Sequence, residues 1–111
     1  MAEIRKIQNA DEYNEFVALS GETLSVLKIG TDFCGPCKVL EAVLGTLTPE
    51  EVEGVDLAEV NADEDWFDNR ASALRIRSIP TLIAFKQGAE IDRLVGGISK
   101  DKVLEFFEKN K

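Results

Sequence analysis

The feature that most constrains this chain is a pair of cysteines, Cys34 and Cys37, which are the only two in the sequence. They follow an apolar run, residues 24–30, and they open a segment whose apolar side chains recur at helical spacing. The pair is therefore predicted at a strand-to-helix junction, in the first helical turn. Helix positions three apart have Cβ atoms about 5–6 Å apart, and a disulfide needs Cα atoms about 4.4–6.8 Å apart. Such a pair can open and close with little backbone movement, as a reversible redox couple requires.

The two sulfurs are not expected to be equivalent. Cys34 is placed where the first backbone N–H groups of the helix lack partners, and these groups and the helix dipole favour an anion. A lowered thiol pKa makes Cys34 the predicted nucleophile, whereas Cys37 lies on the apolar stripe and is predicted to be the buried, resolving partner. Gly35 and Pro36 add no charge between them, and proline is tolerated in a first turn. With no histidine in the chain, the pair is predicted to be a reductant rather than an oxidant.

Two other interpretations of the cysteine pair remain. A zinc site usually needs four nitrogen or sulfur ligands, and without another Cys or any His it would need two chains. A static structural disulfide is the second alternative, but closing so short a loop stabilises a fold little. The strand–helix context favours the redox interpretation.

Length and composition indicate one globular domain, residues 1–111, with 44% hydrophobic residues. The formal net charge of −8 disfavours binding to nucleic acid or anionic membranes, and no apolar run approaches membrane-spanning length. Residues 1–4 do not begin a basic region followed by an apolar one, so no signal peptide and a cytoplasmic location are expected.

Local patterns predict an alternating order of elements. The predicted strands are 3–7, 24–30, 55–61, 82–85 and 90–95; the predicted helices begin at Asn9, at the cysteine pair, near residues 63–65 and at Ser99. The second helix is expected to run to about Thr48, Gly21 to end the first, and Gln87 to Ala89 to form a turn. Trp66, the only tryptophan, is interpreted as a packing residue. Alternation followed by a hairpin predicts a mixed sheet with helices on both faces.

Five segments in this order resemble the thioredoxin family along nearly the whole chain: residues 34–38, 60–63, 76–81, 85–88 and 95–97. The resemblance implies an α/β thioredoxin fold, with a central mixed five-stranded sheet of order 1-3-2-4-5 flanked by four helices. It also implies a cis peptide bond before Pro80, which would place the Ile79–Pro80 turn against the cysteine pair.

The resemblance further implies a shallow apolar substrate surface. Its members would be Phe33, Gly35, Pro36, Ile79, Pro80, Val95, Gly96 and Gly97. Glycines let a substrate backbone approach closely, and an extended substrate segment can then pair with the chain near Ile79.

The same resemblance implies that the chain would be a protein-disulfide reductase of the cytoplasm that serves electron transport and cell redox homeostasis. The Cys34 thiolate would attack a substrate disulfide, and Cys37 would then attack Cys34 to release the reduced substrate. The implied partners are disulfide-bearing proteins and a separate, flavin-containing thioredoxin reductase. We expect a monomer without a cofactor of its own, since the sequence has no Gly-x-Gly-x-x-Gly stretch.

Two departures from the family pattern stand out. Thioredoxins usually carry a buried aspartate where this chain has Lys28 and a lysine where it has Glu59, so we expect a Lys28–Glu59 ion pair of exchanged polarity. Either Glu59 accepts the proton of Cys37, through a water, or the Lys28 cation lowers the Cys37 pKa directly. The alternative is that Lys28 extends to solvent and pairs with nothing. Gly30 also replaces a frequent tryptophan, which predicts a more open pocket.

Two other functional classes remain as alternatives to the reductase. A disulfide oxidase or isomerase of an oxidising compartment is disfavoured by the Gly35–Pro36 dipeptide and by the absence of a visible signal peptide. A non-enzymatic binding subunit that uses the apolar surface is disfavoured because both cysteines are intact.

Overall fold

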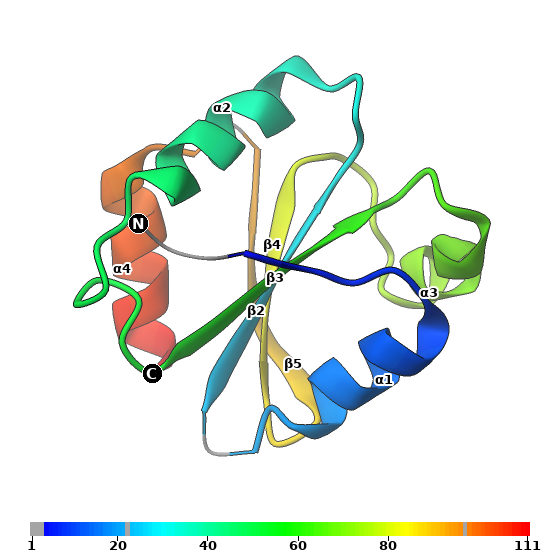
Figure 1. The fold of residues 1–111 in the computed structure, drawn as a ribbon, viewed down its shortest axis with the longest axis horizontal. Helices are drawn as coiled ribbons and strands as arrows, with labels where there is room; N and C mark the ends of the chain where they lie inside the picture. The colour runs from blue at the N-terminus through cyan, green and yellow to red at the C-terminus, as the bar shows by residue number, and fades with distance from the viewer. Residues whose placement is uncertain (1–3, 22, 97) are drawn as a thin grey trace.

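The structure, a computed structural model, describes residues 4–21, 23–96 and 98–111. Within these residues the chain forms one five-stranded mixed sheet of order β1-β3-β2-β4-β5, with helices packed on both faces (Figure 1). The elements are β1 Arg5–Lys6, α1 Ala10–Ala18, β2 Leu24–Gly30, α2 Gly35–Gly45, β3 Val55–Asn61, η1 Asp65–Phe67, α3 Asp68–Ala73, β4 Thr81–Lys86, β5 Ala89–Val95 and α4 Lys100–Asn110. The predicted α/β class, strand order and alternation are confirmed.

Strand β2 forms the centre of the sheet, and every one of its residues is buried. It pairs in parallel with β3 and antiparallel with β4. A strand covered on both faces needs apolar side chains on both, which is why the run from Leu24 to Gly30 could be assigned from sequence. The chain continues from the carboxyl end of β2 directly into the cysteine pair.

The helices divide between the two faces of the sheet. Helices α2 and α4 lie on one face, and α1 and α3 lie on the other (Figure 1). Leu40 and Leu44 of α2 pack with Phe107 of α4 in one hydrophobic cluster, while Phe16 of α1 and Phe67 of η1 belong to the other. The α2 layer is thus anchored on the sheet by its own apolar stripe, and this fixes where its first turn lies.

Side-chain caps begin two of the helices as predicted. The side chain of Asn9 accepts a hydrogen bond of 2.9 Å from the backbone N–H of Glu12, and Ser99 accepts one of 3.4 Å from Lys102. Both satisfy donors that have no partner inside the helix.

The end of α1 differs from the prediction at Gly21. The helix stops at Ala18, because the Ser20 hydroxyl donates to the carbonyl of Val17 at 2.6 Å and accepts from the Gly88 backbone N–H at 2.8 Å. This tertiary contact with the β4–β5 turn ends the helix before the predicted glycine.

Other boundaries are also shorter than predicted. Helix α2 ends at Gly45 rather than near Thr48, since the Thr46 hydroxyl donates to the Val43 carbonyl at 2.7 Å. Strand β1 has only two residues, and the acidic third helix begins as a 3₁₀ turn before α3.

Strands β4 and β5 form the predicted antiparallel hairpin, in which Lys86 pairs with Ala89. The two residues between them, Gln87 and Gly88, have φ angles of 55° and 79°. Two successive positive φ angles suit a tight hairpin turn, and glycine accepts this conformation without a steric cost.

Over the described part of the chain, no helix combines the length and apolar character needed to cross a bilayer.

Candidate active site

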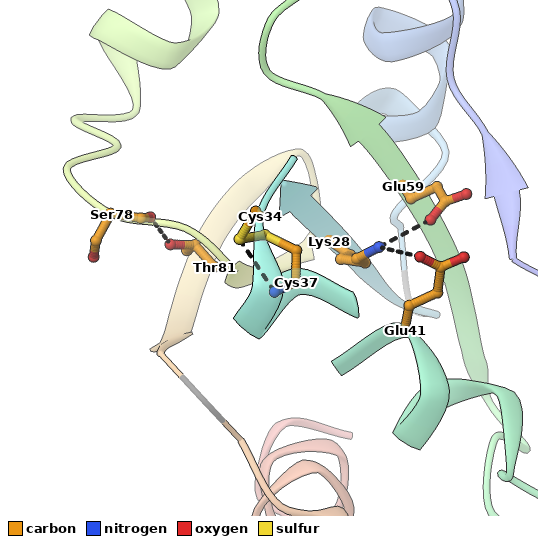
Figure 2. The surroundings of a disulfide bond; sticks show 7 residues. All are labelled: Lys28, Cys34, Cys37, Glu41, Glu59, Ser78 and Thr81. Atoms are coloured by element: carbon orange, nitrogen blue, oxygen red, sulfur yellow. Dashed lines mark hydrogen bonds and ion pairs between the residues drawn. A yellow bond between two sulfur atoms is a disulfide. The ribbon is translucent and has the colours of Figure 1, made fainter. Parts of the chain in front are cut away.

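Cys34 and Cys37 form a disulfide at the start of α2, with their Cα atoms 5.2 Å apart. Cys34 is the N-cap residue of the helix, and its Sγ accepts a hydrogen bond of 3.1 Å from the backbone N–H of Cys37 (Figure 2). The sulfur thus lies where unpaired backbone donors and the helix dipole favour negative charge. This is the geometry that the spacing of the two cysteines predicted.

The two sulfurs differ in their access to solvent. Cys37 is 2% exposed and lies on the same helical stripe as the fully buried Leu40 and Leu44, whereas Cys34 is partly exposed. An incoming reactant can therefore reach Cys34 but not Cys37.

The turn before β4 lies at the same end of the sheet as the disulfide. The peptide bond between Ile79 and Pro80 is cis, as the family resemblance implied. The hydroxyl of Thr81 donates to the carbonyl of Ser78 at 2.7 Å (Figure 2), and Thr81 pairs with Ile29 of β2. Because β4 runs antiparallel to β2, it begins where β2 ends, beside the entry to α2.

The described residues of the predicted substrate surface lie on or directly beside three loops at this end, since Gly35 and Pro36 begin α2 and Val95 ends β5. Phe33 is 96% exposed and Val95 is 50% exposed. Of the others, Gly35 and Pro36 are exposed, Ile79 and Gly96 are partly buried, and Pro80 is buried. The backbone N–H of Gly96 donates to the Pro80 carbonyl at 3.0 Å, which ties two of the loops together. Gly97 lies outside the described residues.

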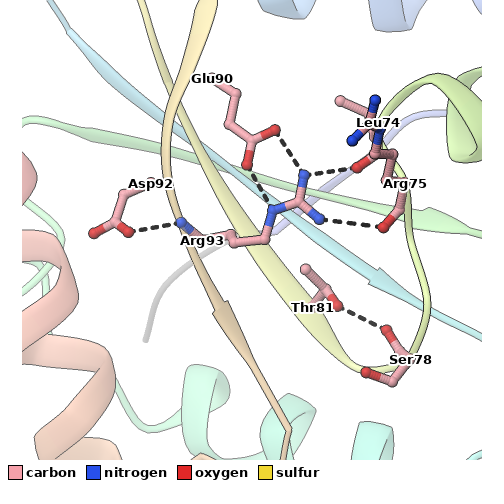
Figure 3. A network of polar contacts seen from close by, with 7 residues as sticks. All are labelled: Leu74, Arg75, Ser78, Thr81, Glu90, Asp92 and Arg93. Atoms are coloured by element: carbon pink, nitrogen blue, oxygen red, sulfur yellow. Dashed lines mark hydrogen bonds and ion pairs between the residues drawn. The ribbon is translucent and has the colours of Figure 1, made fainter.

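A polar network that the sequence did not reveal stabilises the segment that leads to the cis-proline turn. Arg93 on β5 donates to both carboxylate oxygens of Glu90, at 2.6 and 2.7 Å, and to the carbonyl of Leu74 at 2.7 Å (Figure 3). The hydrogen bonds to Glu90 hold the Arg93 pKa above its ordinary value. Arg93 thereby links β5 to the segment that leads from α3 to the cis bond. No local pattern signals a contact across so many residues.

Beneath the disulfide, Lys28 forms the ion pair expected from the exchanged polarity. Its Nζ lies 3.2 Å from Oε2 of Glu59, and the two residues are direct partners in the parallel β2–β3 register (Figure 2). Lys28 is only 6% exposed, so the alternative in which it extends to solvent is wrong. A second carboxylate, that of Glu41, lies 3.9 Å from the same Nζ. Its position four residues after Cys37 on the helix was the signal that could have found it.

Gly30 allows the helix to pack closely on β2. A Cβ atom at this position would lie 3.0 Å from Sγ of Cys37 and 3.3 Å from its Cβ, closer than a side chain tolerates without displacement. Gly30 also lines a polar cleft of about 510 Å³ together with Lys28, Glu41 and Glu59. Neither cysteine lines this cleft, so the more open pocket expected beside the cysteines stays a prediction.

Trp66 lies away from this site. Its ring centroid is 6.4 Å from that of Tyr13 and 5.4 Å from that of Phe67, and all three pack in the cluster on the α1 side of the sheet. Its interpretation as a packing residue is confirmed.

A disulfide at the N-terminus of a helix, with one accessible and one buried sulfur beside a cis-proline turn, defines a thiol–disulfide oxidoreductase. Comparison with known proteins narrows this class. The family model described as Thioredoxin matches residues 4–109, and the chain belongs to the thioredoxin family. It is a protein-disulfide reductase that acts by dithiol–disulfide exchange.

Individual relatives agree with this assignment. The chain is 36% identical to a thioredoxin of Chlamydia caviae over 95% of this chain and 97% of that protein. It is 32% identical to a thioredoxin of Haemophilus influenzae over 99% of both. Among solved structures, a mutant thioredoxin from Halobacterium salinarum has a TM-score of 0.82 at 28% identity, covering 97% of this chain and 90% of that one.

Proposed function

We propose that Cys34 is the nucleophile and Cys37 the resolving cysteine of the exchange reaction. The Cys34 thiolate attacks one sulfur of a substrate disulfide, and the other substrate sulfur leaves as a thiolate. The Cys37 thiolate then attacks Cys34 Sγ, forming the Cys34–Cys37 disulfide and releasing the second substrate thiolate, so that the substrate gains two electrons and the chain loses two. The observation that carries this assignment is the unequal exposure of the two sulfurs, with Cys34 at the helix N-cap.

The substrate is proposed to bind across the three loops around the disulfide. Phe33 and Val95 offer exposed apolar side chains, and Ile79 lies two residues before β4, where an extended substrate segment can pair with the chain. In this proposal, Gly35, Pro36 and Pro80 form the surface between these side chains. Gly96 and Gly97 allow the substrate backbone to approach closely. The Lys28–Glu59 pair supports the site from below.

The partners in this proposal are proteins with accessible disulfides and a separate thioredoxin reductase that returns the chain to its dithiol form. Action as a monomer in the cytoplasm is part of the same proposal. No cofactor is required, because both electrons pass through sulfur.

The roles of the two cysteines are tested by trapping. With a disulfide-bearing protein substrate, Cys37→Ser should accumulate a mixed disulfide through Cys34, because the resolving step is lost. Cys34→Ser should accumulate none under the same conditions, since the buried Cys37 cannot reach the substrate. Non-reducing gel electrophoresis and mass spectrometry measure both, and equal trapping by the two variants would overturn the assignment.

An oxidase or isomerase role is the second candidate, and the buried cation of Lys28 is the observation that favours it. A cation near the thiols stabilises the reduced, anionic form and makes a couple more oxidising. Equilibration of the Cys34–Cys37 couple against glutathione decides between the two. A potential at or below the cytosolic glutathione poise supports the reductase, and one far above it supports the oxidant.

A further inference from the structure

The cluster of Lys28, Glu41 and Glu59 is more than a structural ion pair, because its cation lies close to the resolving sulfur. The Cβ position of Gly30 has three nearest heavy atoms: Sγ of Cys37 at 3.0 Å, Cβ of Cys37 at 3.3 Å and Cε of Lys28 at 3.9 Å. The methylene that carries the Lys28 ammonium group and the Cys37 sulfur therefore flank one point. Neither carboxylate comes as close to it.

The arrangement of charges follows from the secondary structure. Lys28 and Glu59 face each other across the β2–β3 register, and Glu41 lies one helical turn after Cys37 on α2. Lys28 has 8% of its side chain exposed and Glu59 has 18%, whereas Glu41 has 63% exposed. Figure 2 shows the Lys28 ammonium group held between the two carboxylates. The cation and one carboxylate are thus largely buried, whereas the second carboxylate is exposed to solvent.

We propose that Lys28 is a positioning residue that favours the thiolate form of Cys37 in the reduced protein, and that Glu41 and Glu59 weaken this effect. The inference rests on the proposed role of Cys37 as the resolving cysteine. Burial alone would disfavour a thiolate there, and a fixed cation offsets that cost. The thiolate then attacks the mixed disulfide, and its proton leaves through the solvent of the adjacent cleft.

Other charged groups also line the cleft that contains the cluster. They are Lys6 from β1, Lys38 from α2, Asp32 from the loop before α2 and Glu64 from the loop after β3. Among these and the three members of the cluster, Lys28 is the most buried, so its field is the least screened by water. Glu41 is the member whose removal least disturbs packing.

The experiment measures ionisation of Cys37 alone. In a Cys34→Ser background, the thiolate absorbance of Cys37 in the far ultraviolet is followed against pH, with Cys34→Ser/Cys37→Ser as the blank. An opposite charge within about 4–6 Å shifts a pKa by about 1–3 units, so the ionisation constant changes at least about tenfold. Lys28→Met should therefore raise the titration midpoint by about one pH unit, a tenfold change in that constant, whereas Lys28→Arg should keep it near that of the parent.

Glu41→Gln should shift the Cys37 titration midpoint in the opposite direction. Because Glu41 is exposed, this substitution should not disturb folding. It removes a charge that opposes Lys28, so the Cys37 midpoint should fall. The matched control is Glu15→Gln, an exposed carboxylate on α1 across the sheet, which should leave the midpoint unchanged. If Glu41→Gln behaves like Glu15→Gln, or shifts the midpoint upward, the proposal is wrong, even where Lys28→Met does not fold.

Disulfide reduction by the intact dithiol protein is measured in parallel. Failure of the parent protein to reduce a protein disulfide would contradict the proposed function, whatever the titrations give. An active parent with unmoved midpoints would contradict only the role of the charge cluster.

Discussion

At the scale of single residues, the site combines side chains that face solvent with side chains that are sealed from it. Phe33 is almost fully exposed although it is aromatic, and it lies directly before the accessible cysteine. An exposed aromatic side chain contributes little to folding, but it offers a large apolar contact to a partner. The Phe33 side chain is therefore expected to contribute to substrate binding rather than to the stability of the fold.

Phe33→Ala should lower kcat/KM for protein disulfides by about tenfold, since burial of a large apolar side chain is worth roughly 1.5–3 kcal/mol, of which a shallow surface recovers part. Reduction of a protein disulfide, followed against that of a small disulfide, measures the effect. The control is Leu19→Ala, which removes another exposed apolar side chain, 64% exposed, at the end of α1. Equal losses on the protein and the small disulfide would argue against a docking role.

Trp66 gives a second prediction for a single residue. Its fluorescence should change little when the disulfide is reduced, because it packs on Tyr13 and Phe67 on the α1 side of the sheet. The same fluorescence should change strongly on unfolding in urea. A large change on reduction of the native protein would show that the two faces of the sheet communicate.

At the scale of elements, each functional group is placed by a regular structure. The register of β2 with β3 brings Lys28 opposite Glu59, and the packing of α2 brings Glu41 to the same ammonium group. A charge that is buried without its partner is costly. The elements and the ion pair therefore stabilise each other.

Lys28→Ala should destabilise the protein by about 3–5 kcal/mol, because it leaves Glu59 partly buried without its cation. Lys28→Met combined with Glu59→Leu should cost far less, since no unpaired charge remains. Urea unfolding of Lys28→Met, of Glu59→Leu and of the double variant measures the coupling between the residues. Strictly additive changes in the free energy of unfolding would mean that the pair is not coupled.

Many of the helices and strands, and the position of the cysteine pair, could be predicted from the sequence for physical reasons. The apolar run of β2, the cap of α1 at Asn9 and the cysteine spacing all depend on neighbours within a few residues. The contacts of Arg93 with the Leu74 carbonyl and of Ser20 with Gly88 depend on packing between distant segments. Local patterns contain no information on such contacts, so the turn support and the early end of α1 were missed.

At the scale of the whole molecule, carboxylates with perturbed ionisation tie distant segments together. Hydrogen bonds from Asn110 and Lys109 hold the pKa of Asp92 below its ordinary value and so link β5 to α4. The backbone N–H of Thr48 and the Lys100 ammonium group lower the pKa of Glu51, and the Lys100 contact, at 3.4 Å, links the segment after α2 to α4. In both cases the folded protein binds a proton less readily than the unfolded chain does.

Stability should therefore decrease on the acid side. A carboxyl group with a lowered folded pKa contributes stability above its unfolded pKa, about 4 for these groups, and loses it as the pH falls through the folded value. Asp92→Asn should lower stability at neutral pH and flatten its decline below about pH 4. Thermal unfolding across the acid range up to neutrality tests this, with Asp101→Asn, an exposed carboxylate on α4, as the control. An unchanged acid slope would exclude Asp92 as a contributor.

The exchanged polarity of the Lys28–Glu59 pair also limits how this chain can be recombined with its relatives. The resemblance implies that most of them carry the acid on β2 and the base on β3. A chimera with its crossover between residues 31 and 54 would set two carboxylates or two ammonium groups opposite each other under the active site. The two strands therefore need to be exchanged together in such a chimera, and a single substitution toward the common polarity creates a like-charged pair.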